Sequence, residues 1–175
     1  MARNNQGYDK DALNSQEAAE LCSFDKYGEP SDWSAEIKPS KSKKDTGPVR
    51  EFTCGCGLVD NNGVAIEGVR VLYQVLLPKK VAYSRTMATL FKREYRADLR
   101  AVQIENRQPF EAKGGKKHDD WPHIHYGQEV RKLGYDEGRC DMSPQETIDY
   151  FNTKAKINLS PRVECVFDSD KFELS

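Results

Sequence analysis

The chain is constrained most by a series of strand-like segments between residues 49 and 106 that turn residues separate. The segment from Glu51 to Val59 leads into Asp60-Asn61-Asn62-Gly63, whose Asn-Gly pair supplies the positive φ angles of a tight hairpin turn. A long β-rich segment, Val64 to Leu77, follows, and two more are expected at about 81–93 and 95–106. Because strands joined by short turns pair antiparallel, these four segments predict a meander.

Alternation within the segment 95–106 predicts which of its side chains are buried, because successive side chains of a strand point to opposite faces. The face expected to enter the core carries Tyr95, Ala97, Leu99 and Ala101, and the face expected to present charge carries Arg96, Asp98 and Arg100. A sheet that is half apolar in this way needs a covering layer on one side.

A helix near the C-terminus is the expected cover. Ser143-Pro144-Gln145-Glu146 is a capping box with proline at the first helical position, and Ile148, Phe151 and Ala155 follow at helical spacing. Pro161 ends this helical segment. Beyond it, the alternation of Val163, Cys165 and Phe167 predicts a last strand.

The first 48 residues are expected to form a polar N-terminal arm and linker that contains only a short helix, capped by Asn14 or Ser15. Gly, Pro and Ser concentrate between residues 28 and 48 around Lys41-Ser42-Lys43-Lys44-Asp45, a composition that disfavours packed structure. Residues 49–175 are then a single α+β domain. Its antiparallel sheet is expected to have about five to six strands, with the C-terminal helix packed on it.

Charge is distributed unevenly, although the net charge is only -1. Residues 79–117 carry 11 Lys and Arg side chains against four Asp and Glu, whereas the segments on both sides are acidic overall. A basic middle segment of this kind either binds a polyanion or pairs with the protein's own acidic segments.

All three histidines lie between His118 and His125. Histidine titrates near neutral pH and binds metal ions readily, so this cluster is the best candidate for a site. A short strand from His123 to Tyr126 would place His123 and His125 on one side of the sheet and Ile124 in the core. The two imidazoles could then act together, with His118 supplied by the preceding loop.

Several of these features, taken in order, resemble a family. A charged strand Arg96-Ala97-Asp98-Leu99, a loop with the lone His118, the segment Pro122-His123-Ile124-His125-Tyr126 and a closing helix are similar to small β-rich families grouped with TumE-type toxins of bacterial toxin–antitoxin loci. The resemblance covers about residues 70–160 and implies a ribonuclease-type toxin. The long N-terminal arm and the Cys54-Gly55-Cys56 segment depart from the family pattern.

The residues also allow an argument from chemistry. Metal-independent cleavage of RNA needs a base for the 2′-hydroxyl, an acid for the departing 5′-oxygen and a cation at the phosphate. We expect His118, His123 and His125 to form the acid–base set, Arg96 or Arg100 to supply the cation, and Asp98 to orient an imidazole. The side chains expected to bind nucleic acid are Lys92, Arg93, Tyr95, Arg100, Trp121 and Tyr126.

Two other functions stay open at this point. The chain could be a non-catalytic interaction protein, such as a phage or bacterial anti-defence inhibitor that binds a nucleic-acid-binding or acidic partner surface. It could also be a metal-dependent hydrolase in which His123 and His125 bind an ion with His118, Asp119 or Asp120. Cys54-x-Cys56 is interpreted as a structural pair, because one intervening residue makes tetrahedral chelation awkward.

The expected partners and location follow from what the sequence contains and lacks. RNA is the expected ligand, an antitoxin or host defence complex is the expected kind of protein partner, and an exposed sheet edge could form a homodimer. We expect no nucleotide cofactor, since no phosphate-binding or dinucleotide fingerprint occurs, and the metal-independent chemistry assigns no metal ligands. No apolar run approaches the roughly 20 residues that span a bilayer, and no secretory segment is visible, which predicts a cytoplasmic protein without a membrane partner.

Overall fold

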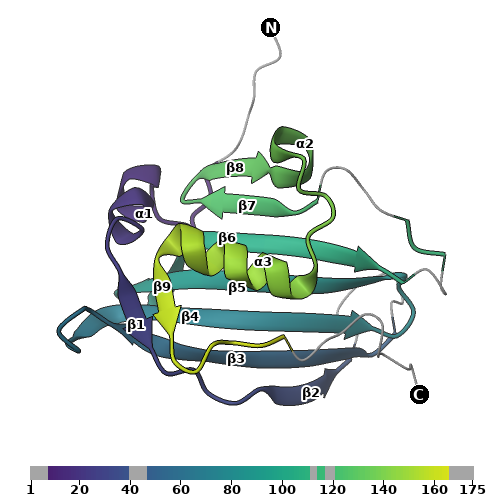
Figure 1. Cartoon of the computed structure of the whole chain (residues 1–175), viewed down its shortest axis with the longest axis horizontal. Helices are drawn as coiled ribbons and strands as arrows, with labels where there is room; N and C mark the ends of the chain where they lie inside the picture. The colour runs from purple at the N-terminus through teal and green to yellow at the C-terminus, as the bar shows by residue number, and fades with distance from the viewer. Residues whose placement is uncertain (1–7, 40–46, 111–113, 117–120, 166–175) are drawn as a thin grey trace, which may run out of the picture.

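Six consecutive strands form an antiparallel meander, and the first four of them are the segments that the turn residues predict (Figure 1). They are β3 (Val49–Val59), β4 (Ala65–Pro78), β5 (Tyr83–Glu94), β6 (Ala97–Pro109), β7 (His123–Tyr126) and β8 (Glu129–Lys132). The computed structural model describes residues 8–39, 47–110, 114–116 and 121–165. In the predicted turn, Gly63 has a φ of +76°, whereas Asn62 does not adopt the positive φ expected of it. The Asp60 carboxylate accepts hydrogen bonds from the amides of Asn62 and Val64 at 2.8 and 3.0 Å.

Three further strands enlarge the sheet to nine strands, more than the five to six expected. They are β1 (Lys26–Gly28), β2 (Ser34–Lys38) and β9 (Ile157–Leu159). The order is β8-β7-β6-β5-β4-β3-β1-β9, with β2 also paired to β3. Because β1 and β9 run parallel, the sheet is mixed rather than purely antiparallel. These strands have three to five residues, too few for a period-two pattern to identify them.

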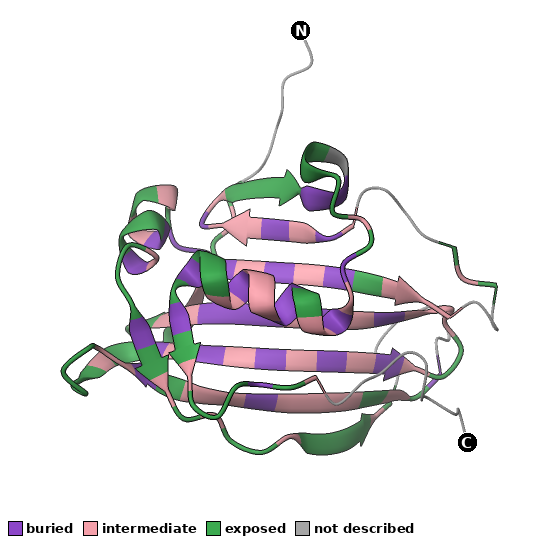
Figure 2. Cartoon of the chain, viewed as in Figure 1, coloured by how far each residue is buried: buried purple, intermediate pink, exposed green. Residues whose placement is uncertain are grey.

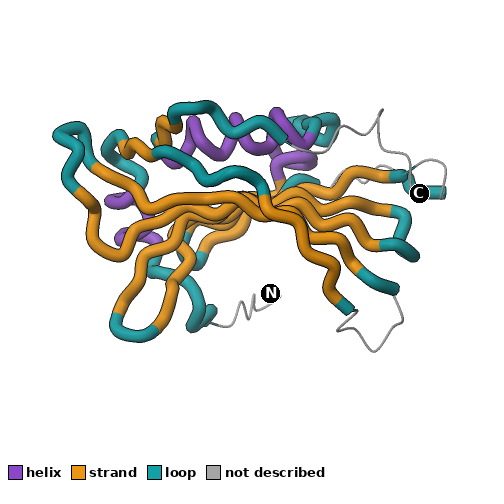
Figure 3. Tube along the Cα trace, turned by 90° about the horizontal axis from the view of Figure 1, so that it is seen from below, coloured by secondary structure: helices purple, strands orange, loops and turns teal. Residues whose placement is uncertain are grey.

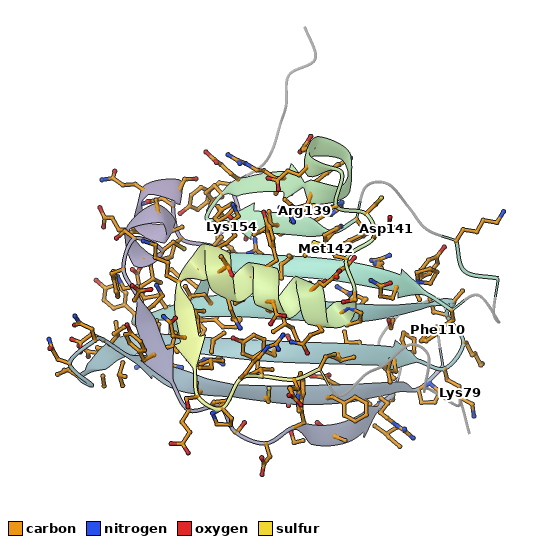
Figure 4. The ribbon with its side chains drawn as sticks, in the orientation of Figure 1. Lys79, Phe110, Arg139, Asp141, Met142 and Lys154 are labelled. Carbon is orange, nitrogen blue, oxygen red and sulfur yellow. The ribbon has the colours of Figure 1, made fainter. Side chains whose placement is uncertain are left out.

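One face of the sheet is covered by helix α3 (Pro144–Ala155), as its sequence predicts (Figure 3). The Ser143 hydroxyl accepts a hydrogen bond from the Glu146 amide, and the Glu146 carboxylate accepts one from the Ser143 amide, so the capping box is complete. Ile148 and Phe151 are fully buried against the sheet. Arg139 and Lys154, labelled in Figure 4, lie over the ring of Tyr150 of α3, 4.8 and 5.4 Å from its centroid.

Burial alternates along the central strands, as the stripes in Figure 2 show. On β4 the buried side chains are Val69, Val71, Tyr73, Val75 and Leu77, and those between them are half-buried. Tyr73 meets Phe151 of α3 edge to face at 6.2 Å, and its hydroxyl donates to the Asn152 side chain. The sheet thus has a core face under α3 and an opposite face that no helix covers in the described part of the chain.

The N-terminal part is built into the domain instead of forming the expected arm and linker. Leu13 donates its amide to the Arg100 carbonyl at 2.9 Å, and Arg100 donates its own to the Asp11 carbonyl at 2.9 Å, so this segment lies along β6. Helix α1 (Ser15–Leu21) follows, capped by the Asn14 side chain, and buries Ala18 and Leu21 in the core. Residues 40–46 lie outside the described residues.

Helix α2 (Leu133–Glu137) follows β8 directly. The expected last strand is not formed over the described residues, because Val163 and Cys165 lie in irregular structure, and Phe167 lies outside them. No helix in the described part of the chain is long and apolar enough to cross a membrane.

Lys26 of β1 is a completely buried charge that joins α1 to the sheet. Its ammonium donates hydrogen bonds to the carbonyls of Leu21 and Phe24 at 2.5 and 2.8 Å and lies 4.6 Å from the centre of the Phe24 ring. Burial lowers the pKa of Lys26 from 10.5 to about 8. The side chain therefore satisfies the carbonyl of Leu21, the last residue of α1, and that of Phe24 in the following loop, at the cost of desolvating its charge.

Replacing Lys26 by Met should lower the free energy of unfolding at pH 7 by about 1–3 kcal/mol, because two buried carbonyls lose their donor. The pKa of Lys26 is about 8 in the folded chain and near its ordinary 10.5 in the unfolded chain. Between these values the unfolded chain binds the extra proton, so this side chain makes stability rise with pH. Urea unfolding from pH 7 to 10 should show the gap between wild type and Lys26→Met widening above pH 8, and a constant gap would contradict the burial argument.

Candidate functional site

The candidate site lies on the open face, by which we mean the side of β4–β7 opposite α3. By strand register, the open face carries Arg70, Leu72, Gln74 and Leu76 of β4, Arg85, Met87, Thr89 and Phe91 of β5, Arg100, Gln103, Glu105 and Arg107 of β6, and His123 and His125 of β7. Along each strand these residues alternate with residues of the core face. Residues that are register partners on neighbouring strands lie on the same face.

Both described histidines point to the open face because Ile124 between them is completely buried. In the register, His123 lies opposite Glu105 and His125 lies opposite Gln103. Both imidazoles are half-buried. The strand rise of about 3.3 Å per residue places the two side chains about 6.6 Å apart along β7.

His125 lies among charged groups that depress its basicity. Burial lowers the pKa of His125 below its ordinary 6.5, and the positive charge of Arg100 lowers it further, while Glu105 and Asp9 act in the opposite direction. Arg100 is held in place by the Asp9 carboxylate at 2.5 Å and by the Gln103 side chain at 3.5 Å. His125 is therefore an uncharged proton acceptor at neutral pH, with a guanidinium nearby.

Trp121 forms the aromatic part of the site. Its ring stacks on the imidazole of His123, with centroids 4.0 Å apart and planes inclined by 17°. The guanidinium carbon of Arg107 lies 4.4 Å from the centroid of the same ring. Aromatic and guanidinium planes of this kind are the surfaces on which unpaired bases stack.

The cations beside the histidines are partly neutralised. Arg85 forms an ion pair with Glu105 at 2.6 Å, and Arg107 approaches the same carboxylate at 3.8 Å. Glu105 is the residue opposite His123 in the sheet, so one carboxylate serves two guanidinium groups and adjoins the imidazole. A guanidinium that is already oriented by a carboxylate loses little freedom when a ligand arrives.

Several expected site residues lie away from the histidines. Arg96 and Tyr95 form the exposed turn between β5 and β6, and Tyr95 has a φ of +56°. Gln103, the partner of His125, is seven residues further along β6 than Arg96, about 23 Å at the strand rise. Arg96 is therefore not the cation of the site, and Tyr95 is not a stacking surface beside it.

The same end of the sheet holds other expected residues. Asp98 binds Arg70 at 3.1 Å and Arg93 at 3.5 Å, so its carboxylate pairs with guanidinium groups instead of orienting an imidazole. Lys92 pairs with Glu94 at 3.7 Å, at that end too. By register, Asp98 lies on the side of the open face, whereas Lys92, opposite the buried Val69, lies on the other side of the sheet. Neither belongs to the group around His125.

Tyr126 is on the wrong face for the expected role. It follows His125 on β7, so it points to the core side, where it packs against the buried cluster that includes Ile124 and Phe151. Burial raises the pKa of Tyr126 to about 12. Of the expected nucleic-acid contacts, the structure brings Trp121 and Arg100 to the two described histidines.

The metal alternative is not supported within the described residues. They contain no group of three or more His, Cys, Asp or Glu side chains that could hold an ion. His118, Asp119 and Asp120 lie outside the described residues. Cys54 is buried in the core, and burial raises the pKa of its thiol to about 12, which agrees with the structural interpretation of the Cys54-x-Cys56 pair.

Sequence reasoning missed four members of the site. Glu105 and Arg107 alternate with buried Ile104 and Asn106 on β6, so parity alone would have placed them beside the histidines. Arg85 is found through its pairing with Arg107 across the β5–β6 register. No sequence signal indicated Asp9, because its position depends on the N-terminal segment packing along β6.

Comparison with known proteins does not identify the chain. No family model, no curated protein and no solved structure matches it. The resemblance to TumE-type toxins therefore stays a prediction, and the function is argued from the site.

The titration of His125 tests this geometry without any assay of function. Its pKa, followed through the imidazole proton resonances in NMR spectra, should lie below 6.5. Arg100→Gln should raise the pKa of His125, because this substitution removes a positive neighbour. Glu105→Gln should lower the pKa of His125 further, because it removes a negative neighbour. Arg93→Gln is the control at a distant arginine and should leave the titration unchanged. A His125 that titrates at or above 6.5 would contradict the described surroundings.

Proposed function

We propose that the open face binds single-stranded RNA and that His123 and His125 cleave one of its phosphodiester bonds without a metal ion. The proposal rests on one observation above all. Two imidazoles lie side by side on an uncovered sheet face, with Arg100 near one of them and the Trp121 ring stacked on the other.

His125 is assigned the role of general base. An imidazole with a lowered pKa is unprotonated at neutral pH, as the base for a 2′-hydroxyl must be. It takes the 2′-hydroxyl proton while the oxygen attacks the adjacent phosphorus, which forms a 2′,3′-cyclic phosphate and releases the 5′-oxygen. Arg100, the described guanidinium that lowers the pKa of His125, is placed to stabilise negative charge on the phosphoryl oxygens.

His123 is assigned the role of general acid. A separation of about 6.6 Å along the strand allows one phosphodiester group to lie between the two imidazoles, so that the attacking and the leaving oxygens face different rings. In its protonated form His123 donates the proton that the 5′-oxygen needs as its bond to phosphorus breaks. Glu105 lies opposite His123 in the register and supplies a carboxylate on the same face of the sheet.

Trp121 and Arg107 are assigned to base binding. Their planes lie together beside His123 at the end of β7 where the strand begins. An unstacked base can lie on such a surface, whereas a duplex hides its bases, so the proposal specifies single-stranded RNA. A stacked base next to the imidazole pair would hold its own phosphate near the reacting groups.

The test is cleavage of a fluorescent RNA oligonucleotide in the presence of EDTA. His125→Gln should reduce the cleavage rate by about 10²–10⁴-fold and leave the Kd for the oligonucleotide nearly unchanged. His123→Phe keeps a stacking ring but removes the exchangeable proton, so it should have the same effect. Products should end in a 2′,3′-cyclic phosphate, and a 2′-O-methyl substrate should bind without being cleaved.

Each outcome has a distinct meaning. Equal cleavage by wild type and both histidine variants would contradict the assigned chemistry. Loss of activity in EDTA with recovery on adding a metal ion would show that the reaction is metal-dependent. If wild-type protein does not bind RNA, the whole proposal fails.

A second function is favoured by the carboxylates on the open face. Arg70, Arg85 and Arg100 are each paired with an acid, which weakens attraction to a phosphate backbone and suits a mixed-charge protein surface. A non-catalytic inhibitor would bind its protein partner equally well after His125→Gln. It would lose binding after Arg107→Glu on the same face, measured with a purified candidate partner.

A further inference from the structure

A second guanidinium–aromatic stack lies on the same open face. The guanidinium carbon of Arg70 is 4.6 Å from the centroid of the Phe91 ring, and Arg70 lies directly opposite Phe91 in the β4–β5 register. Asp98 fixes the guanidinium from the side at 3.1 Å. With 42% of its side chain exposed, Arg70 still presents surface to solvent. The arrangement repeats that of Arg107 on Trp121.

A hollow adjoins Arg70. It has a volume of about 360 Å³, and its lining includes Ser34, Thr53, Gly55, Gly57, Arg70 and Leu72. Gly55 and Gly57 of β3 lie opposite Leu72 and Arg70, so two positions next to the stack carry no side chain. Because a Cβ atom at Gly57 would meet nothing within 4 Å, the missing side chain at Gly57 leaves the hollow open beside Arg70.

Gly57 has no structural requirement to be glycine. A Cβ atom added there would meet nothing within 4 Å, whereas one added at Gly55 would come within 2.3 Å of the Val71 carbonyl oxygen. Glycine in the middle of a strand weakens it by about 0.5–1 kcal/mol relative to alanine. Packing thus explains Gly55 but not Gly57. Gly57 borders a register shift in the β3–β4 pairing, and a strand glycine marks either such an irregularity or a place where a ligand approaches the backbone closely.

The second stack is well separated from the first. Arg100, opposite Phe91, and Arg107, beside Trp121, are separated along the sheet by the six residues between their β5 partners Phe91 and Arg85, which corresponds to about 20 Å. The histidine pair lies between them along the same direction, opposite Gln103 and Glu105. A strand of nucleic acid that touched both stacks would therefore pass the imidazoles.

We propose that Arg70, Phe91 and the hollow beside Gly57 form a second base-binding subsite for the same RNA strand. The proposal depends on the RNA binding proposed above and specifies its substrate as a single strand long enough to reach both stacks. Single-stranded binding sites of about 4–16 nucleotides are typical of comparable surfaces. Because Asp98 pairs with Arg70 at 3.1 Å and offsets its charge, the subsite takes the flat face of a base rather than a phosphate.

The experiment measures the Kd of fluorescent two- and eight-nucleotide RNAs as a function of salt. Arg70→Lys keeps the charge but loses the planar group, Phe91→Leu loses the ring, and Gly57→Val fills the hollow. Each should weaken binding of the eight-nucleotide RNA about tenfold and leave the two-nucleotide RNA unaffected. The slope of log Kd against log salt should stay the same, because no phosphate contact is lost.

Arg93→Lys is the matched control. Arg93 contacts the same Asp98 carboxylate at 3.5 Å, and no ring contact of Arg93 is found among the described residues. Its substitution should not change either Kd. Thermal unfolding of each variant provides the check that the sheet remains folded.

The two proposals fail in different ways. If no RNA binds wild-type protein, RNA binding itself is wrong. If the eight-nucleotide RNA binds and Trp121→Ala weakens it, but the three subsite variants bind as tightly as wild type, only the second subsite is wrong. A decrease of about 0.7 in the salt slope for Arg70→Ala would show that Arg70 contacts a phosphate, which would also overturn the subsite.

Discussion

The burial of Ile124 against the core decides where every candidate group on β7 points. Ile124 is completely buried opposite Ile104, which is completely buried as well, and both belong to the cluster that α3 covers through Ile148 and Phe151. Since side chains of a strand alternate, this packing sends His123 and His125 to the open face and sends their partners Glu105 and Gln103 with them. The site is thus a consequence of hydrophobic packing on the other side of the sheet, where a shift of one residue would bury both imidazoles.

Local chemistry predicted the central part of the fold well. The Asn62-Gly63 turn and the Ser143–Glu146 capping box were both found where their residues indicated them. The strands β1 and β9 could not be predicted, because three residues show no period and their pairing joins segments about 130 residues apart. For the same reason the N-terminal segment was taken for an arm. Its place beside Arg100 depends on tertiary contacts that leave no local pattern.

The site shows the same division between local and long-range information. Parity along β7 predicted the shared face of the histidines, and the same parity should have excluded Tyr126. Arg96 was expected in a strand but lies in the turn, since the strands pair only up to Glu94 and Ala97. Arg107 was missed because the strand was expected to end at about residue 106. In the structure β6 continues to Pro109, which pairs with Tyr83 of β5. Trp121 was expected in the site because it lies two residues before His123 in the sequence. Asp9 could not be predicted, because more than 100 residues separate it from the histidines in the sequence.

Tryptophan fluorescence tests whether RNA binds on the open face. The chain has two tryptophans, and they lie on opposite sides of the sheet. Trp121 stacks on His123, whereas Trp33 packs against the buried cluster of Val75 and Leu77 and donates to the Glu164 carbonyl at 2.7 Å. Single-stranded RNA added to the Trp33→Phe variant should quench the remaining Trp121 emission in a saturable manner, and the Trp121→Phe variant should show no change. Quenching of Trp33 with an unchanged Trp121 signal would place the ligand on the helix side and contradict the assignment of the open face.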